Sequence, residues 1–409
     1  MQSMATSQCR QLSVMVCWLY ASPNAQLNPR EPAALSPSNT NAGREITVMS
    51  YAIGNETTFG IACLGITHPH TSGRVKAFQR MPNAKVLGAY DASPLLDPFV
   101  EAMGIAKRTK DEILSDPDVH AVLIHPKSYL MADWAMEAME AGKAVLCEKP
   151  AGRGSVDTSR LVECVERTGQ LCQVGYCWRY APSVDKMQEV LQAGQLGKVL
   201  QVRAHAGCSH GEADTDHMRQ PGDIGGAFYV IGCHTIDRLL LHFGMPQSVN
   251  ARISKFDGVM TPDAREDAVG AILNYADKLI TIDFMSWDPL PWTESWDITA
   301  YGTEGVMHSR PLPASYKLYS TGKTGLPEGW TEWNETSFPE IWAVRKTVYS
   351  PEIAEIGNPV YFDREAAAFA NSIRSGASSN VPVHQAHNIN RILEALFQSS
   401  SQNGTEIKL

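Results

Sequence analysis

Apolar and polar positions follow two alternating patterns along residues 59–176. Short apolar runs predict buried strands, and the stretches between them repeat apolar residues every three or four positions, which is typical of helices. The strands are expected at residues 59–66, 84–91, 120–126, 143–150 and 170–176. Strands that alternate with helices over short connections predict a parallel sheet covered on both faces. This is the doubly wound, Rossmann-type arrangement of nucleotide-binding domains.

A different pattern follows residue 176. One helix is predicted at residues 183–194, and the long apolar runs after it predict strands. These strands are expected at residues 198–207, 247–256, 268–287 and 294–302. The turn sequence at residues 276–278 divides the third of them into a hairpin. With a helix at residues 227–243 and two more helices near the end, this pattern predicts a C-terminal α/β domain with a large, mostly antiparallel open sheet.

Residues 1–57 show neither pattern. They are rich in Ser, Asn, Pro, Gln and Ala, which predicts a disordered N-terminal extension. An apolar stretch from Leu12 to Ala21 follows Arg10, and it leaves a targeting segment open as the alternative. The expected division is an extension at residues 1–57, a dinucleotide-binding domain at residues 58–176 and a substrate and oligomerisation domain at residues 177–409.

Composition narrows the class of protein. Of the 409 residues, 44% are hydrophobic and 19% are charged, which excludes a largely disordered or fibrous chain. The net charge is 35 − 44 = −9, so we expect no nucleic-acid partner, because phosphate contacts need clustered Lys and Arg. No apolar run approaches the roughly 20 residues that span a bilayer. For the same reason we expect no membrane partner. Nine irregularly spaced cysteines are typical of reduced, buried thiols, so we expect a cytoplasmic protein.

The first predicted strand ends in a degenerate glycine loop. A dinucleotide fingerprint reads G-x-G-x-x-G, but here Gly65 alone is in place, and Thr67 and His70 replace the other two glycines. An ordinary turn is the alternative interpretation. Asp91 ends the second strand, where an acidic side chain can bind the ribose hydroxyls and favours NAD over NADP. A helix cap or turn residue is the alternative for Asp91.

Two further segments carry candidate chemistry. Lys149 follows the fourth strand, at the sheet edge where open α/β sheets bind ligands. A Gly-Gly turn at residues 225–226 leads into the helix that carries His234. The segment from His205 to His217 is rich in His, Cys, Asp and Glu, but its spacing fits no zinc pattern. We therefore expect no metal, and we expect that loop to border the substrate pocket.

Several motifs in order resemble the Gfo/Idh/MocA family of NAD(P)-dependent oxidoreductases, from Phe59 to the C-terminal end. The motifs are Glu148-Lys149-Pro150, the G-Y-x-x-R-Y-x-P segment at residues 175–182, G-Q-L-G-K at residues 194–198, the helix from Gly225 to His234, Y-G-T-E-G-V-M from Tyr301, and R-E-A-A-A-F from Arg364. The resemblance implies hydride transfer between a nicotinamide and a hydroxyl or carbonyl carbon of a sugar, a polyol or a related small molecule. It also implies a homo-oligomer, a dimer or a tetramer, through the open sheet.

The same resemblance implies roles for individual residues. Lys149 would polarise the reacting oxygen, and His234 would accept the hydroxyl proton. The implied cofactor-binding residues, for NAD or alternatively NADP, are Gly65, Thr67, His68, Asp91, Pro126, Glu148 and Lys149. The implied substrate-binding residues are Lys149, Arg179, Asp223 and His234, with a structural ion pair as the alternative for Arg179.

One position departs from the family pattern. Many members carry an Asp four residues before the catalytic His, but this chain has Val230 there. The loss of that carboxylate leaves Asp237, Asp223 or the substrate to orient His234. Together with the degenerate glycine loop, it keeps open a catalytically silent, cofactor-binding regulatory protein of the same fold.

Overall fold

The computed structural model describes most of the chain after the N-terminal segment. The described residues are 58–208, 223–256, 265–288, 296–335, 345–346, 354–355 and 359–409. The predicted extension at residues 1–57 and most of the loop that ends at His217 lie outside them. Within the described residues, no helix combines the length and the apolar character that crossing a bilayer requires.

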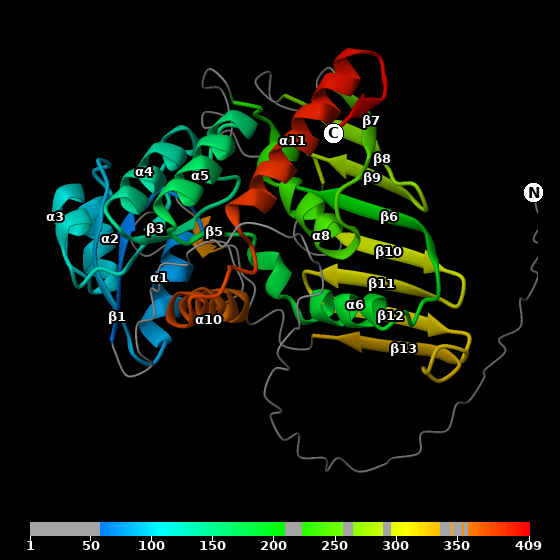
Figure 1. Cartoon of the computed structure of the whole chain (residues 1–409), viewed down its shortest axis with the longest axis horizontal. Coiled ribbons are helices and arrows are strands. Elements are labelled where there is room, and N and C mark those ends of the chain that lie inside the picture. Colours follow the sequence, from blue (N-terminus) through cyan, green and yellow to red (C-terminus); the bar gives the residue numbers. More distant parts are fainter. Residues whose placement is uncertain are drawn as a thin grey trace, which may run out of the picture. The chain divides into compact units, whose positions relative to one another are not determined.

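Strands of the N-terminal half form the predicted parallel sheet (Figure 1). They are β1 (Phe59–Leu64), β2 (Ala84–Tyr90), β3 (Ala121–Ile124), β4 (Ala144–Cys147) and β5 (Cys172–Val174), in the order β2-β1-β3-β4-β5. The helices between them are α1 (Thr71–Arg80), α2 (Leu96–Met103), α3 (Lys110–Ser115), α4 (Ser128–Glu140) and α5 (Ser155–Thr168). Every residue of β1, β3, β4 and β5 is buried, which explains their continuous apolar runs.

The second sheet is larger and mostly antiparallel, as predicted. Among the described strands its order is β13-β12-β11-β10-β6-β9-β8-β7-β16. The bounds are β6 (Val199–Gly207), β7 (Ser248–Ser254), β8 (Ala268–Asn274), β9 (Leu279–Met285), β10 (Asp297–Gly302), β11 (Gly305–Pro311), β12 (Ala314–Ser320), β13 (Gly329–Asn334) and β16 (Ile407–Lys408). The predicted hairpin is the antiparallel pair β8–β9, whereas β6 and β9 run parallel. A separate small pair joins β14 (Arg345–Lys346) to β15 (Ala354–Glu355).

Helices of the C-terminal half differ from the prediction at one place. They are the 3-10 turn η1 (Cys177–Tyr180) and the helices α6 (Pro182–Gln192), α7 (Ala227–Val230), α8 (Cys233–Phe243), α10 (Pro359–Ser375) and α11 (Val383–Ser401). The single helix predicted at residues 227–243 is wrong, because it is divided into α7 and α8. Gly232 lies at the break, where a Cβ would approach the Phe228 carbonyl to 2.5 Å.

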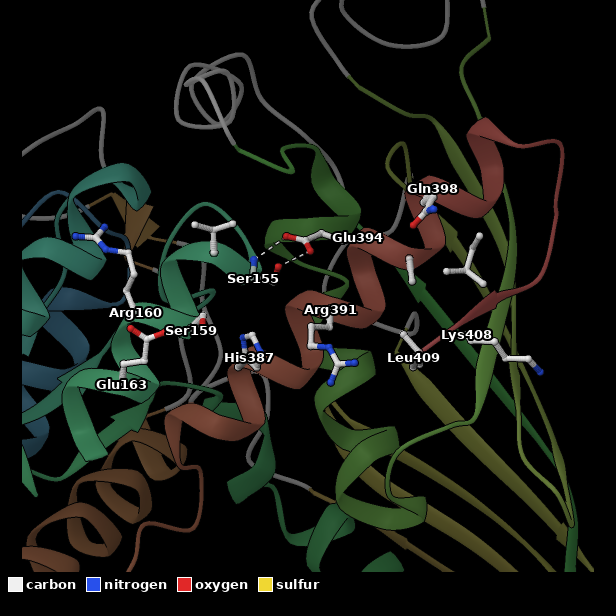
Figure 2. A pocket seen from close by; sticks show the side chains of 13 residues that line it. Ser155, Ser159, Arg160, Glu163, His387, Arg391, Glu394, Gln398, Lys408 and Leu409 are labelled. Atoms are coloured by element: carbon white, nitrogen blue, oxygen red, sulfur yellow. Dashed lines mark hydrogen bonds between the residues drawn. The ribbon is translucent and has the colours of Figure 1, made fainter. Parts of the chain in front are cut away.

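The last two long helices return to the N-terminal half. Helix α10 packs against α1, and α11 packs against α5 (Figure 1). A groove of about 580 Å³ lies along α5 and α11, and the end of the chain completes its wall (Figure 2). Ser155 and Glu394 are bonded across it, with the Ser155 amide donating to Glu394 Oε1 at 2.6 Å. None of the predicted site residues lines this groove.

The described cysteines match the expectation of buried thiols. All seven of them, from Cys63 to Cys233, are free and buried. Burial raises the pKa of both Cys147 and Cys233 to about 12. Because the thiolate is the reactive form, these side chains act as small apolar groups of the core.

Candidate active site

The carboxyl end of β4 places Lys149 inside the molecule. β4 ends at Cys147, and Glu148 and Lys149 follow before a cis peptide bond to Pro150. Lys149 is only 2% exposed, and its Nζ donates to the backbone carbonyl of Val230 at 3.0 Å. A buried ammonium group requires such acceptors. The last residue of α7 therefore holds Lys149 through its backbone.

Gly65 lies where ligands of an open α/β sheet bind. It follows β1, which pairs with β2 on one side and with β3 on the other, so the strand order reverses there. Gly65 has a φ of +90°, and a Cβ on it would lie 2.2 Å from the backbone nitrogen of Pro126. A residue other than glycine would collide there. The turns after β1 and β3 are thus in backbone contact.

Asp91 is tied to the same glycine turn. Its Oδ2 accepts a hydrogen bond from the Ile66 amide at 2.8 Å, and its Oδ1 accepts one from the Ser93 amide at 2.7 Å. The predicted cofactor residues therefore follow the carboxyl ends of four neighbouring strands. They are Gly65, Thr67 and His68 after β1, Asp91 after β2, Pro126 after β3, and Glu148 and Lys149 after β4.

A charged cluster follows this edge, and sequence reasoning identified only one of its members, Glu148. We call Arg74, His125, Glu148 and Glu365 the Arg74 cluster, and all four are buried. The Arg74 guanidinium is paired with Glu148 through Nη1 and with Glu365 through Nε, the latter at 2.6 Å. Its Nη1 also lies 3.0 Å from His125 Nε2, and its Nη2 donates to the Gly175 carbonyl at 2.9 Å. Burial opposes the charge, but Glu365 outweighs it and raises the pKa of Arg74.

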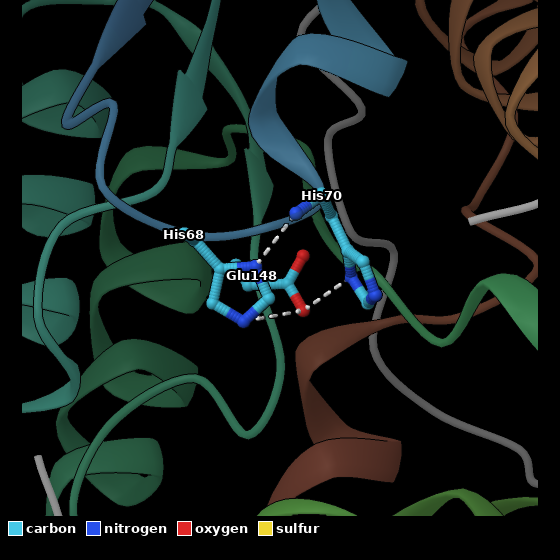
Figure 3. A group of neighbouring side chains, drawn as sticks. All are labelled: His68, His70 and Glu148. Carbon is cyan, nitrogen blue, oxygen red and sulfur yellow. Dashed lines mark hydrogen bonds and ion pairs between the residues drawn. The ribbon is translucent and has the colours of Figure 1, made fainter. Parts of the chain in front are cut away.

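The other carboxylate oxygen of Glu148 faces two imidazoles. Figure 3 shows His68 and His70 on either side of it, both from the turn after β1. Oε1 lies 3.1 Å from His70 Nδ1 and 3.7 Å from His68 Nε2. Burial, followed by neighbouring positive and imidazole groups, lowers the pKa of both histidines well below the usual value. Both imidazoles are therefore neutral at pH 7.

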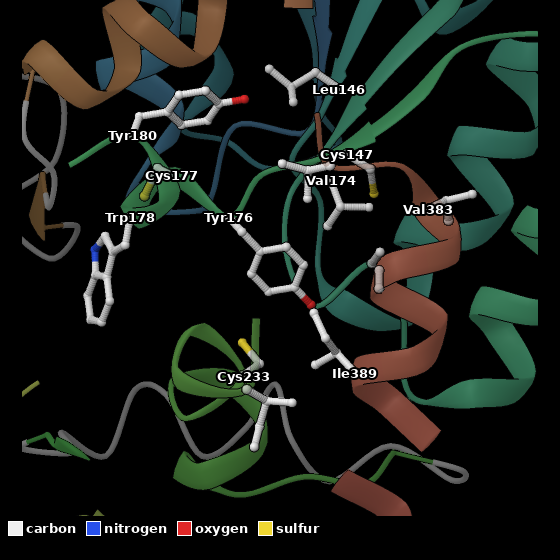
Figure 4. Close-up of a cluster of buried hydrophobic side chains, with 14 of the residues drawn as sticks. Leu146, Cys147, Val174, Tyr176, Cys177, Trp178, Tyr180, Cys233, Val383 and Ile389 are labelled. Atoms are coloured by element: carbon white, nitrogen blue, oxygen red, sulfur yellow. The ribbon is translucent and has the colours of Figure 1, made fainter. Parts of the chain in front are cut away.

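His234 lies in an aromatic cluster. We call His234, Tyr176 and Trp178 the His234 cluster, and Figure 4 shows its two aromatic side chains beside Cys233. The His234 ring stacks on Trp178 at 4.3 Å between ring centroids and meets Tyr176 edge-on at 5.8 Å. Its Nδ1 has no hydrogen-bond partner among the described residues. Burial, followed by the charge of Lys149, lowers the pKa of His234 well below its usual value.

The two predicted substitutes for the missing carboxylate do not behave alike. Asp237 is buried and accepts hydrogen bonds of 2.7–2.9 Å from Arg179, so both of its carboxylate oxygens are bonded to Arg179. Arg179 also donates to the Asn380 carbonyl at 2.9 Å. This geometry supports the structural alternative for Arg179. Asp223 is half-buried and begins the described segment that leads into α7.

Glu266 is a second buried acid that sequence reasoning missed. Its Oε1 accepts a hydrogen bond from the Phe228 amide at 2.7 Å, in the first turn of α7. Gly226 makes room for it, since a Cβ there would lie 2.1 Å from Glu266 Oε2. Burial raises the pKa of Glu266 to about 7. Glu266 thus anchors the start of the short helix whose last carbonyl holds Lys149.

Comparison with known proteins decides the family. Residues 59–176 match the model of the oxidoreductase family with an NAD-binding Rossmann fold, and residues 184–308 match the Gfo/Idh/MocA C-terminal domain. The chain belongs to the Gfo/Idh/MocA family. A family member named D-xylose 1-dehydrogenase (NADP(+)) 2, from Haloferax volcanii, is 23% identical over 73% of this chain and 83% of its own length.

Two further members of the Gfo/Idh/MocA family show how far the likeness reaches. An uncharacterised oxidoreductase, ORF334 of Rhizobium meliloti, is 36% identical over 39% of this chain, and the match spans 47% of that relative. The solved structure of levoglucosan dehydrogenase with NADH and levoglucosan superimposes with a TM-score of 0.72, at 20% identity, over 86% of this chain and 99% of that one.

These matches confirm the predicted family, the fold class and a nicotinamide dinucleotide as the cofactor. The relatives reported above are named as oxidoreductases or dehydrogenases, so they give the regulatory alternative no support. The residue roles, the domain boundary at residue 176 and the N-terminal extension stay predictions.

Proposed function

We propose that this chain is an NAD(P)-dependent dehydrogenase or reductase that acts on the CH–OH group of a sugar, a polyol or a related small molecule. One observation carries the proposal. Lys149 is buried at the carboxyl edge of the Rossmann sheet, and its charge helps to lower the pKa of the buried His234, whose Nδ1 has no partner among the described residues. A cation and a neutral base that act on one substrate are what the oxidation of an alcohol requires.

The carboxyl edge of the sheet fits a dinucleotide. Gly65 lies at the point where the strand order reverses and allows a close backbone approach, and Asp91 is tied to the same turn. When bound there, the nicotinamide supplies the hydride acceptor or donor. In support of a sugar-like substrate, one relative is named for D-xylose and one solved relative holds levoglucosan.

Each proposed catalytic residue has one task. In alcohol oxidation the Lys149 ammonium donates to the substrate oxygen and stabilises the charge that develops on it. The neutral His234 imidazole takes the hydroxyl proton at an unprotonated ring nitrogen as the C–H hydride leaves. Trp178 stacks on the imidazole and fixes its plane. We assign Asp223 to the wall of the substrate pocket and Arg179 to its structural ion pair with Asp237.

The test combines cofactor binding with turnover. NADH and NADPH are titrated against the protein by fluorescence, and sugars and polyols are then screened for reduction of the preferred cofactor. We expect tighter NADH binding, since Asp91 disfavours a 2′-phosphate. Lys149→Met should lower turnover more than tenfold, while His387→Gln on α11 should leave it unchanged. Tight cofactor binding without turnover of any compound in a broad panel would support the silent alternative instead.

We also propose that the chain forms a homo-oligomer through the outer face of the nine-stranded sheet. Ile272, Leu279 and Trp330 are exposed there by 36%, 42% and 62%, and an apolar surface of this kind is typical of an interface. The substitution Leu279→Glu should shift the sedimentation coefficient toward that of the monomer. A cytoplasmic location and the absence of nucleic-acid and membrane partners remain parts of the proposal.

A further inference from the structure

Three ligand-type side chains converge at the turn after β1. His68, His70 and Glu148 each offer one atom, and these atoms all lie within 4.8 Å of one another. In the described part of the chain, no other group of His, Cys, Asp and Glu meets this criterion. We infer that His68, His70 and Glu148 form a binding site for one divalent first-row cation, for which Zn²⁺ is the probe.

The distances fit a single ion. Ligands at ~2.0–2.2 Å from a tetrahedral Zn²⁺ lie roughly 3.3 Å from one another. Glu148 Oε1 lies 3.1 Å from His70 Nδ1 and 3.7 Å from His68 Nε2. Small side-chain movements therefore bring the three atoms to coordination distance. Two imidazoles and one carboxylate form a ligand set that first-row divalent cations prefer over Mg²⁺.

The surroundings support a ligand role for Glu148. Its second oxygen, Oε2, is paired with the Arg74 guanidinium, which Glu365 binds in turn. Carboxylate ligands of metals are commonly held in this way by a hydrogen-bond donor on the oxygen that faces away from the ion. Arg74 would thus fix the carboxylate and leave Oε1 directed at the two imidazoles. His68 is half-buried, with 18% of its side chain exposed, so an ion can enter past it.

The imidazoles are in the charge state that ligation requires. Burial keeps both neutral, so an ion does not have to displace protons from them. Two rearrangements are needed. The neutral His70 donates its Nδ1 proton to Glu148 Oε1 at 3.1 Å, so coordination through Nδ1 moves that proton to Nε2. The His70 amide donates to His68 Nδ1 at 3.2 Å, which leaves the His68 proton on Nε2. Coordination through Nε2 moves that proton to Nδ1 and breaks this long hydrogen bond.

The site uses other residues than the segment that is rich in His, Cys, Asp and Glu. That segment runs from His205 to His217, and only its first residues are described. His205 pairs with Asp283 on the neighbouring strand β9. The candidate site instead uses Glu148, the neighbour of Lys149, and two residues that replace a glycine-rich loop. An ion there would hold the turn after β1 to the end of β4.

The experiment measures binding directly and does not depend on activity. Tag-free, chelator-treated full-length protein is titrated with Zn²⁺ by calorimetry and with Co²⁺ by visible absorption, with Mg²⁺ as the comparison ion. We expect one Zn²⁺ per chain, Co²⁺ bands of a low-symmetry nitrogen and oxygen site, and no Mg²⁺ binding. His68→Ala and His70→Ala should each weaken Zn²⁺ binding by more than about tenfold.

The control variant is His387→Gln, a histidine on α11 that contacts Thr158 and lies outside the cluster. It should bind Zn²⁺ like the unaltered chain. Circular dichroism and thermal unfolding show whether each variant is folded, and His68→Ala is the decisive one because His68 is the most exposed of the three ligands. No Zn²⁺ binding by the unaltered chain, or equal binding by folded His68→Ala, would overturn the inference.

Discussion

The Arg74 cluster and the His234 cluster are both buried and polar, but they differ in how their polar atoms are satisfied. In the Arg74 cluster the guanidinium has two carboxylates, a carbonyl and an imidazole around it. In the His234 cluster His234 Nδ1 and Tyr176 Oη have no partner among the described residues, nor does the adjacent Thr235 Oγ1. Buried polar groups are almost always paired, so the unpaired ones agree with the proposal that a substrate binds at the His234 cluster. The Arg74 cluster is the part that holds the fold together.

The largest expected effect tests the structural role of the Arg74 cluster. Arg74→Met leaves the Glu148 and Glu365 carboxylates buried without their cation, so the free energy of unfolding should fall by about 3–5 kcal/mol in urea denaturation. Arg80→Met is the matched control, because Arg80 joins the same two helices through Asp363 at the surface. That exposed pair should contribute less than about 1 kcal/mol. Equal losses in both variants would contradict the structural role of the Arg74 cluster.

A third buried polar group, Glu266, should make the free energy of unfolding depend on pH. Burial raises its pKa to about 7, so the folded chain binds this proton more tightly than the unfolded chain does. The stability that the protonated form contributes is complete below pH 4.5 and is lost as the pH rises through 7. Glu266→Gln should therefore raise the free energy of unfolding at pH 8 by up to roughly 3 kcal/mol relative to the unaltered chain. It should bring no gain near pH 5.

The exposed Glu332 on β13 provides the control for that measurement. Glu332→Gln should change the free energy of unfolding by less than about 0.5 kcal/mol at either pH. If Glu266→Gln raised the free energy of unfolding equally at pH 5 and at pH 8, the pKa of Glu266 would not be raised in the folded chain.

His234→Ala should separate activity from stability. Turnover is expected to fall more than tenfold, equivalent to about 1.4 kcal/mol in the activation free energy. The free energy of unfolding should fall by up to about 1.5 kcal/mol for the lost ring stacking, with a further loss for the apolar area and the cavity that the buried ring leaves. Steady-state kinetics and urea denaturation on the same preparation give both values. A large loss of stability with unchanged turnover would place His234 with the structural residues.

The smallest effect concerns a single hydroxyl group. Tyr176→Phe removes Oη, which has no partner among the described residues, so the free energy of unfolding should stay the same or rise by up to about 1 kcal/mol. The KM for the substrate should rise several-fold if this hydroxyl binds it. A clear loss of stability would show instead that the hydroxyl is paired within the protein.

Much of the fold could be predicted from hydrophobic periodicity. The strands β1, β3 and β4 are continuous apolar runs because both faces are covered, and the β8–β9 hairpin shows the strict alternation of a sheet with one buried face. The break between α7 and α8 could not be predicted this way. It depends on the contact of Gly232 with Phe228, and periodicity records only which face of a helix is buried.

The candidate site was predicted unevenly for a physical reason. Lys149 and His234 belong to short motifs, so local sequence marks them. Arg74 carries no local signal, because a charged residue on a helix usually faces water. Glu365 lies in the R-E-A-A-A-F motif, but its pairing with Arg74 is visible only in three dimensions. The acceptor for Lys149 is the backbone carbonyl of Val230, a group that every residue type offers. The side chain at position 230 therefore gave no indication of it.

The ion pair between Arg74 and Glu365 also has a consequence for how the chain folds while it is being synthesised. The two residues are 291 positions apart in the chain. A ribosome that adds about 5–20 residues per second needs roughly 15–60 s to pass from one to the other. For that interval the newly made helix α1 lacks both its second carboxylate and the covering helix α10. The nascent Rossmann sheet therefore reaches its final packing only when the last tenth of the protein is made. A ribosome that stalls before residue 365 holds about nine tenths of the chain, in which Arg74 still lacks the Glu365 carboxylate.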